Sequence, residues 1–333
     1  MGHLADLSTD GDGSEISKTV SFYAVHMLKR MRQQKRRKNT IELHERCLRL
    51  YLLPFAGQRV VSSLRRTDSL AVMDYLLAHP RLRSPYTVNQ AFRTWVAVMH
   101  HAADQGVTLP SNLVTRIGRA ETPPRSRKLL TPSEVRALAE AMHRQRPRYA
   151  IAIWLGACAG LRKGEIFGLK WEHIDIERGL LTVQEQLQSG RVTPLKSRAS
   201  YATLAVDHFL LRQLAAHLRE FPSALRNGQR SGYVLTRDGH HPVTRGMFDG
   251  QWRRAVEDSA LARGTCPTDL RVFYASTLAN ANRHSPKKVQ RLARHAHMSH
   301  TWDLYVLPPL ADDMGRVDDF TAAFADTVND LQN

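Results

Sequence analysis

The chain has 333 residues, in which 48 lysines and arginines outnumber 31 aspartates and glutamates, so its formal charge is +17. This length exceeds what one hydrophobic core usually supports and predicts two domains of roughly 100 to 200 residues each. The excess of positive charge predicts a polyanionic partner, with nucleic acid as the first candidate. No stretch approaches the ~20 consecutive apolar residues of a membrane span, and the start, MGHLADLSTDGDGSE, lacks the basic and then apolar pattern of a secretory signal. We therefore expect a cytoplasmic protein with no membrane partner.

Residues 1–19 are polar and acidic, and we expect a disordered tail there. Residues 20–118 show helical spacing throughout and predict a domain of four helices. The second helix begins near the capping residue Thr40 and stops at Pro54 and Gly57, the third is capped by Thr67, and the fourth ends at Gly106. The predicted inward-facing residues of the four helices are Val20, Tyr23, Met27 and Met31; Leu43, Cys47, Leu48, Tyr51 and Leu52; Leu70, Met73 and Leu77; and Val88, Phe92, Trp95, Met99 and Ala102.

Residues 119–130 are rich in proline and charge, and predict a basic inter-domain linker. A second domain, residues 131–333, opens with a helix, because Thr131 is a cap, Pro132 holds the first helical position and Glu134 completes a capping box. Two β-like runs, LLTVQEQL and YATLAV, predict a small antiparallel sheet, and helices return after residue 207. The predicted fold class is mainly α with a small antiparallel β-sheet.

The three cysteines are far apart and show no CxxC spacing. A disulfide framework or a zinc knuckle is therefore not indicated. We expect buried free thiols at Cys47, Cys158 and Cys266.

The second domain has three basic side chains that are candidates for binding or reacting with an anion. Arg162 and Glu165 follow an apolar helix, with Gly160 and Gly164 allowing close backbone approach; an ordinary Arg/Glu pair is the alternative. Arg271, in TDLRVFYAS, is either paired inside the fold or directed at an anion. The third cation is Lys196, on the predicted turn between the two strands, where a solvated lysine is the alternative.

The stretch ARHAHMSHTWDLY holds His295, His297 and His300, followed by Tyr305. A zinc site needs three or four ligands on one face, yet on a helix only His297 and His300 would share one. We therefore predict no metal site and no cofactor.

Taken together and in this order, these segments resemble the tyrosine recombinase (phage integrase) family, and the tail is most similar to integrases of actinobacterial (mycobacterial) temperate phages. The most specific segments are AGLRKGEIFGLKWEHIDIE, DLRVFYAS with SPKKVQRLARH, and TWDLY, and the resemblance spans residues 20 to 320. It implies a helical core-type DNA-binding domain and a mixed α/β catalytic domain that close around duplex DNA as a C-shaped clamp.

The resemblance also implies the chemistry of the site. Tyr305 would attack phosphorus and form a 3′-phosphotyrosine, which needs neither ATP nor a metal. Arg162 and Arg271 would hold the non-bridging oxygens, since planar guanidiniums stabilise the charge that builds on the phosphorane. Lys196 would protonate the departing 5′ oxygen, and His295 would hydrogen-bond the phosphate.

Glu165 would support the site without touching DNA. His297 and His300 match no functional position of the family. Arg294 stands where members commonly have glycine and would add charge beside the site. Thr268 stands where a proton-transfer histidine or lysine is usual, so either that role is dispensable here or a neighbour such as His295 covers it.

The implied partners are double-stranded DNA at attachment sites, a homotetramer on paired sites, a host DNA-bending protein and an excision factor. The implied function is integration and excision of phage DNA. Alternatives are a chromosome or plasmid dimer resolvase, a transposon recombinase, or a non-cleaving DNA-binding regulator, for which Thr268 is the only argument. A C-terminal helical tail would dock on its own or a neighbouring catalytic domain. The expected DNA-binding residues are Lys35, Arg36, Arg37, Lys38, Arg125, Arg127 and Lys128.

Overall fold

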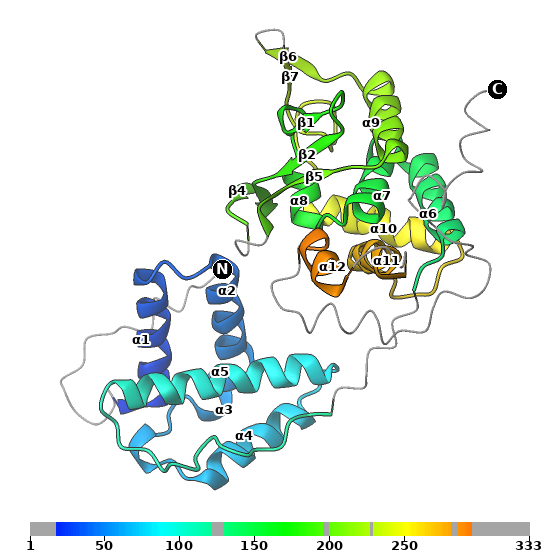
Figure 1. Ribbon diagram of the computed structural model, residues 1–333. Helices are drawn as coiled ribbons and strands as arrows, with labels where there is room; N and C mark the ends of the chain where they lie inside the picture. The colour runs from blue at the N-terminus through cyan, green and yellow to red at the C-terminus, as the bar shows by residue number, and fades with distance from the viewer. Residues whose placement is uncertain are drawn as a thin grey trace. The chain divides into compact units, whose positions relative to one another are not determined.

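The structure, a computed structural model, describes residues 18–121, 129–188, 190–195, 200–226, 229–280 and 285–294. The chain forms two compact units that divide after residue 125. The described part of the first unit is helical, whereas the second combines helices with short antiparallel strands (Figure 1). The predicted fold class, mainly α with small antiparallel sheets, is confirmed. None of the helices in these ranges is long and apolar enough to cross a membrane.

In the first unit, α5 crosses α1 and α2, which lie side by side, and α4 also packs on α5 (Figure 1). Its elements are α1 (Val20–Gln33), α2 (Lys38–Cys47), the π-helix η3 (Leu48–Leu52), α3 (Leu53–Ala56), the 3-10 helix η4 (Val61–Ser63), α4 (Arg66–Ala78) and α5 (Pro85–Asp104).

The core of this unit follows the predicted faces of α1, α2 and α5. All five predicted residues of α5 are buried, and Trp95 also donates a hydrogen bond from Nε1 to Ser69 Oγ at 3.0 Å. In α1 and α2 with η3, the predicted residues are buried except Met31 and Leu43, which are partly buried against the core. Gly106 has a φ of +88°, as its predicted helix-ending role requires.

The predicted face of α4 is wrong. Leu70 and Leu77 are 39% and 53% exposed, and of the predicted three only Met73 is buried. The buried face instead contains Ser69, whose hydroxyl accepts the bond from Trp95. A polar residue inside the stripe therefore hid the true periodicity. The predicted cap Thr67 is also wrong, because the helix begins at Arg66, after the Arg65 N–H donates to the Asp68 carboxylate at 2.7 Å.

The predicted start of the second helix is wrong as well. The connection after α1 is tight, with Lys35 at a φ of +51° and the Arg36 N–H bonded to the Met31 carbonyl, so α2 starts at Lys38 rather than near Thr40. At the other end the helix stops at Gly57, the second predicted stop and the C-cap of α3. It continues past the first, Pro54, although proline lacks an N–H and crowds the carbonyl four residues earlier. The π turn just before it, η3, widens the helix and lets it continue.

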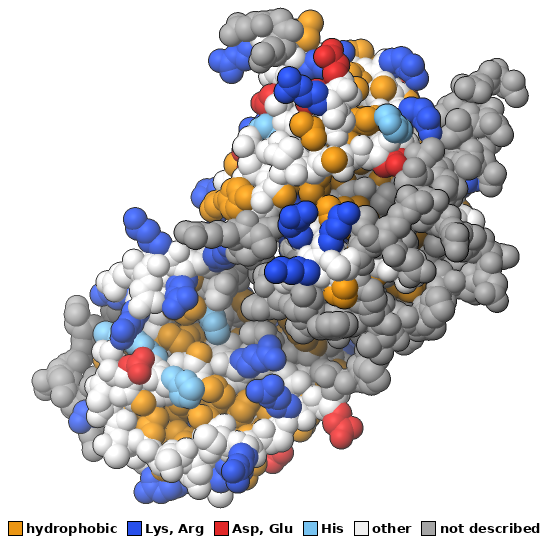
Figure 2. Space-filling view, in the orientation of Figure 1, with side chains coloured by type: hydrophobic (Ala, Val, Ile, Leu, Met, Phe, Trp, Pro, Cys, Tyr) orange, Lys and Arg blue, Asp and Glu red, His pale blue; other side chains and the backbone are white. Residues whose placement is uncertain are grey.

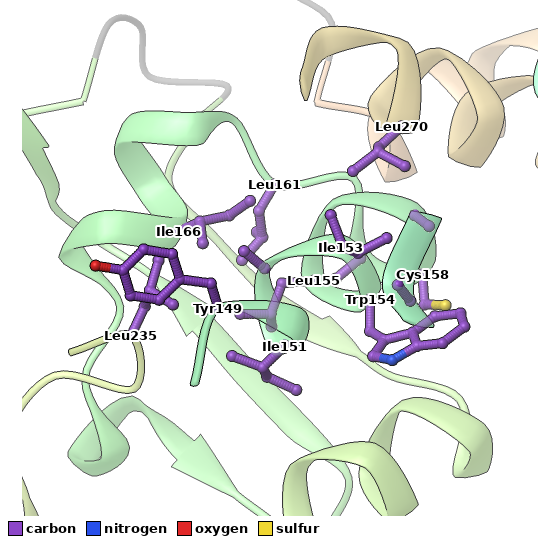
Figure 3. Packing of buried hydrophobic residues seen from close by; sticks show 14 of the residues in the cluster. Tyr149, Ile151, Ile153, Trp154, Leu155, Cys158, Leu161, Ile166, Leu235 and Leu270 are labelled. Carbon is purple, nitrogen blue, oxygen red and sulfur yellow. The ribbon is translucent and has the colours of Figure 1, made fainter. Parts of the chain in front are cut away.

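The second unit is built around α7, whose residues 151–159 are all buried. Figure 3 shows Ile151, Ile153, Trp154, Leu155 and Cys158 pointing in different directions from α7 into the surrounding core. Helices α6, α9 and α11 pack around it. The helices are α6 (Pro132–Gln145), α7 (Pro147–Ala159), α8 (Lys163–Gly168), η5 (Trp171–His173), α9 (His208–Glu220), α10 (Arg245–Asp258), α11 (Pro267–Asn280) and α12 (Pro286–Leu292).

The start of α6 confirms its predicted capping box. Thr131 Oγ1 accepts from the Glu134 N–H at 3.2 Å, and Glu134 Oε2 accepts from the Thr131 N–H at 2.8 Å. Cys47 and Cys158 are free and buried as expected, and burial raises the pKa of both thiols. Cys266 is also free but only partly buried, which corrects the prediction.

The strands are short and all antiparallel. The predicted run LLTVQEQL covers β2 and the first two residues of β3, and YATLAV contains β5; β2 and β5 pair with Leu181 opposite Leu204. Between them lies a separate hairpin of β3 and β4, and a further hairpin of β6 and β7 follows α9; neither was predicted. The strands are β1 (Ile174–Asp175), β2 (Leu180–Val183), β3 (Gln186–Gln188), β4 (Arg191–Thr193), β5 (Ala202–Ala205), β6 (Ala224–Arg226) and β7 (Gln229–Ser231).

Candidate active site

The site begins at the junction between α7 and α8. Gly160 ends α7 with a φ of +59°, and a Cβ there would lie 2.8 Å from Tyr274 Cε1 and closer still to Cδ1. Only glycine therefore fits both the backbone conformation and the space. Two residues later Arg162 caps α8, and its N–H donates to Glu165 Oε2 at 2.9 Å. The tight turn directs Arg162 back toward the carboxylate of its own helix.

The side chain of Arg162 is one-third exposed, and hydrogen bonds fix its guanidinium. Nη1 donates to Glu165 Oε1 at 2.8 Å and to Ser200 Oγ at 3.0 Å. Nη2 donates to the carbonyl of Arg294 at 3.4 Å. The guanidinium is thus fixed by its partners while part of it remains open to a ligand.

Arg271, on α11, is buried beside it. Its guanidinium donates to the carbonyls of Gly160, Ala293 and Arg294. Burial, reinforced by the charges of Arg162 and Arg294, lowers the pKa of Arg271 to about 9, so the side chain is still charged at neutral pH. Carbonyl oxygens orient this charge but do not neutralise it.

A third guanidinium, that of Arg294, completes the cluster and is 1% exposed. Nη1 donates to Glu165 Oε2 at 2.9 Å, and Nη2 donates to the Gly160 carbonyl at 2.9 Å. The sequence indicated only added charge beside the site, whereas the structure places this side chain at its centre. Its φ is +55°, a left-handed conformation that glycine adopts without strain.

The cluster carries more positive than negative charge. Burial opposes ionisation of Glu165, but the charge of Arg294 and the bonds from Arg162 hold the pKa of its carboxyl below the ordinary value. Of the described residues, only Glu165 forms an ion pair with any of the three arginines. Three guanidiniums and one carboxylate leave two formal positive charges in a largely buried place. Such an excess favours an anion with several oxygens, because burying an unpaired charge is costly.

A model of the Phage integrase family matches residues 128–308, which is more than half of the chain. The chain belongs to the phage integrase family. A search of curated protein sequences gave no match.

Solved integrase structures share the fold of this family member. The integrase of transposon Tn1549 in complex with transposon right-end DNA has a TM-score of 0.72 at 18% identity, over 94% of this chain and 99% of that one. A lambda integrase dimer bound to a core site has a TM-score of 0.68 at 15% identity, over 89% and 98%. A lambda integrase tetramer bound to a Holliday junction has a TM-score of 0.66 at 17% identity, over 89% and 80%.

Three residues to which the family resemblance assigns roles lie outside the described residues. They are Lys196, His295 and Tyr305, and His297 and His300 lie outside them as well. Two of these undescribed segments adjoin described residues that contact the arginine cluster. Ser200 follows the segment with Lys196 and contacts both Arg162 and Arg294, and Arg294 itself directly precedes His295. Thr268 is exposed in the first turn of α11, three residues before Arg271.

The expected DNA-contacting residues of the first unit, Lys35 to Lys38, are all exposed in the α1–α2 connection and the start of α2. Figure 2 shows lysines and arginines spread over the visible face of both units. Arg125, Arg127 and Lys128 lie outside the described residues.

A cavity elsewhere in the second unit is separate from this integrase site. A small cavity of about 110 Å³ lies at the end of α9, lined by side chains that include Arg148, Trp171, His217 and Phe221, and no residue of the arginine cluster contributes to it. In the described part of the chain no three His, Cys, Asp or Glu side chains converge on one point.

Proposed function

We propose that the chain is a site-specific DNA recombinase that cleaves and rejoins DNA through a 3′-phosphotyrosine and that integrates and excises phage DNA. The observation that carries the proposal is the cluster of Arg162, Arg271 and Arg294 around one carboxylate, in a chain of the phage integrase family. Recombinase activity follows from family membership. Origin in an actinobacterial temperate phage rests on the resemblance of the tail.

The reaction exchanges one phosphodiester for another. The Tyr305 oxygen forms a bond to phosphorus while the bond from phosphorus to the 5′ oxygen breaks, and Lys196 donates a proton to that oxygen. Arg162 and Arg271 stabilise the charge on the two non-bridging oxygens. The reverse attack by a 5′ hydroxyl of another strand releases the tyrosine. No net hydrolysis occurs, so no ATP is required.

The proton of Tyr305 needs an acceptor, because a phenol with a pKa near 10 is a weak nucleophile at neutral pH. Thr268 cannot accept it. We assign this role to His295, which also hydrogen-bonds the phosphate, and Glu165 supports Arg162 without touching DNA.

DNA binding uses both units in this proposal. A helical core-binding domain, residues 20–118, and a catalytic domain, residues 131–333, close around the duplex. Lys35 to Lys38 contact the backbone, and so does the linker with Arg125, Arg127 and Lys128. A homotetramer on paired sites is supported by the dimer and tetramer complexes of lambda integrase. A host DNA-bending protein and an excision factor complete the proposed set of partners.

A transposon recombinase is the second candidate. The specific observation in its favour is the Tn1549 transposon integrase, whose TM-score of 0.72 is above the 0.68 of the lambda integrase dimer. The chemistry of the site would be the same, so only the DNA target separates the two candidates.

Capture of a covalent adduct tests the function. The protein is incubated with a pool of nicked duplexes, in which the short strand beyond the cleavage site diffuses away, and protein-linked strands are recovered and sequenced. We expect an adduct through a 3′ phosphate that still forms in EDTA. Tyr305→Phe should bind the recovered duplex about as tightly and form no adduct. Absence of an adduct with the wild-type protein, or its presence with Tyr305→Phe, would contradict the proposal.

A further inference from the structure

Arg294 connects the two arginines that the mechanism uses. It shares the Glu165 carboxylate with Arg162, which bonds Oε1 while Arg294 bonds Oε2. It shares the Gly160 carbonyl with Arg271. Its own carbonyl accepts from Nη2 of both partners at 3.4 Å. The side chain of Arg294 therefore contacts the supports of Arg162 and Arg271, and its backbone carbonyl contacts both guanidiniums directly.

This arrangement is costly to build. Arg294 holds a left-handed backbone conformation that glycine would adopt without strain, and its guanidinium is almost fully removed from water. Among the described residues its Nε has no hydrogen-bond partner. A turn alone would not need this side chain, so its value lies in what the guanidinium holds.

The geometry points to Arg294 as a positioning residue for strand cleavage, a role that rests on the proposed function. Its fork fixes the Glu165 carboxylate and the Gly160 carbonyl in place, and these in turn orient Arg162 and Arg271 toward one phosphate diester. Because Glu165 pairs with two guanidiniums, its single negative charge offsets only part of the charge of Arg162, and the remainder is available to the phosphate. Arg294 itself does not touch the DNA.

The competing interpretation is that Arg294 only fills space in the core. Two substitutions separate these roles. Arg294→Met keeps most of the volume but loses the charge and the fork, whereas Arg294→Lys keeps the charge but cannot donate in two directions from one plane. A space-filling role predicts normal cleavage by both variants once they are folded.

The first measurement is the rate of adduct formation at saturating DNA on the duplex recovered by the capture experiment. We expect both variants to be at least tenfold slower than wild type, with DNA dissociation constants within about threefold of it, because orientation acts on the chemical step. Arg291→Met, an exposed arginine on the preceding helix α12, is the matched control and should cleave normally. Cleavage by Arg294→Met within twofold of wild type would overturn the proposal. So would a slower rate that is fully explained by the fraction of unfolded variant under the assay conditions, as calculated from its urea unfolding curve.

A double-mutant cycle distinguishes action through Glu165 from simple destabilisation of the protein. If Arg294 acts through Glu165, the double variant of Arg294→Met and Glu165→Gln should be about as slow as the slower single variant. Rate losses that multiply would show that the two side chains act separately, which would contradict the positioning role.

Inorganic phosphate provides a measurement that does not depend on cleavage. Phosphate should raise the urea midpoint of the wild-type protein more than that of Arg294→Met, because the arginines are oriented to bind it only in the former. If the wild-type protein forms no adduct but shows this difference, the proposed function fails and the positioning role at an anion site stands. If wild type and Arg294→Met form adducts at the same rate, the positioning role fails and the function stands.

Discussion

At the scale of single residues, Gly160 determines whether the site can form. Its φ of +59° disfavours any side chain, and the ring of Tyr274 occupies the place of a Cβ. We expect Gly160→Ala to lower the free energy of unfolding by about 2 to 5 kcal/mol, from the left-handed strain together with overpacking. Urea unfolding of the variant measures this loss.

The matched control is Gly190→Ala in the same unit. Gly190 has a φ of +74°, but no atom lies within 4 Å of its would-be Cβ. This variant carries the strain alone and should lose only about 1 kcal/mol. Equal losses in the two variants would show that the contact with Tyr274 does not matter.

The sequence located three of the four clustered side chains, Arg162, Glu165 and Arg271, because an arginine in an apolar stretch is conspicuous and the resemblance fixes its place. It did not show that Arg294 is buried. The buried guanidinium donates to the carbonyls of Gly160 and Ser200, which are more than 90 residues away in the chain. Local pattern carries no signal for such contacts.

At the scale of elements, predictions succeeded where a long apolar period had nothing to disturb it. Helix α5 has every predicted residue buried, whereas α4 uses Ser69 as an inward residue and so broke the pattern. The three-residue strands of the two extra hairpins are too short to show any alternation. The π turn before Pro54 could not be predicted either, since proline usually ends a helix.

Helix α9 supplies a prediction about acid stability. His217 on this helix is buried, stacks on Trp171 and hydrogen-bonds the Val234 carbonyl. Burial lowers the pKa of His217 from 6.5 to about 4, and the hydrogen bond to Val234 opposes this only in part. Between pH 6.5 and about 4, His217 is protonated in the unfolded chain but stays neutral in the folded chain. The free energy of unfolding should therefore fall as the pH drops from about 6.5 to 4, by on the order of 3 kcal/mol in total.

Comparison with His217→Gln measures this contribution, because glutamine keeps an N–H donor but does not titrate. Urea unfolding at several pH values between 7 and 4 should show a weaker pH dependence in the variant. His173, whose pKa is also lowered by burial, will leave a residual slope in both proteins. Identical pH dependence in wild type and variant would show that the pKa of His217 is not lowered by folding.

At the scale of the whole molecule, a chain of two units carries a formal charge of +17, which calls for a polyanionic partner. The arginine cluster accounts for only a small part of the excess, and its side chains are largely buried. Many of the other described lysines and arginines are exposed, where an extended polyanion could contact them, and the run from Lys35 to Lys38 is the densest part that the sequence singled out. A long duplex, rather than one phosphate, matches this distribution.

Salt dependence tests this distribution. Each phosphate that a cation neutralises releases counterions, so the logarithm of the binding constant should fall with the logarithm of salt concentration by about 0.9 per contact. Replacing Lys35, Arg36, Arg37 and Lys38 with alanine should lower the slope by up to roughly 3.6 if all four contact phosphates. A matched set of four exposed arginines in the second unit serves as the control and should change the slope far less: Arg178, Arg219, Arg226 and Arg230. Fluorescence anisotropy with a labelled duplex at 50 to 300 mM salt gives both slopes. The assignment of Lys35 to Lys38 would have to be abandoned if the two quadruple variants lost the same slope, because nonspecific charge would then explain binding.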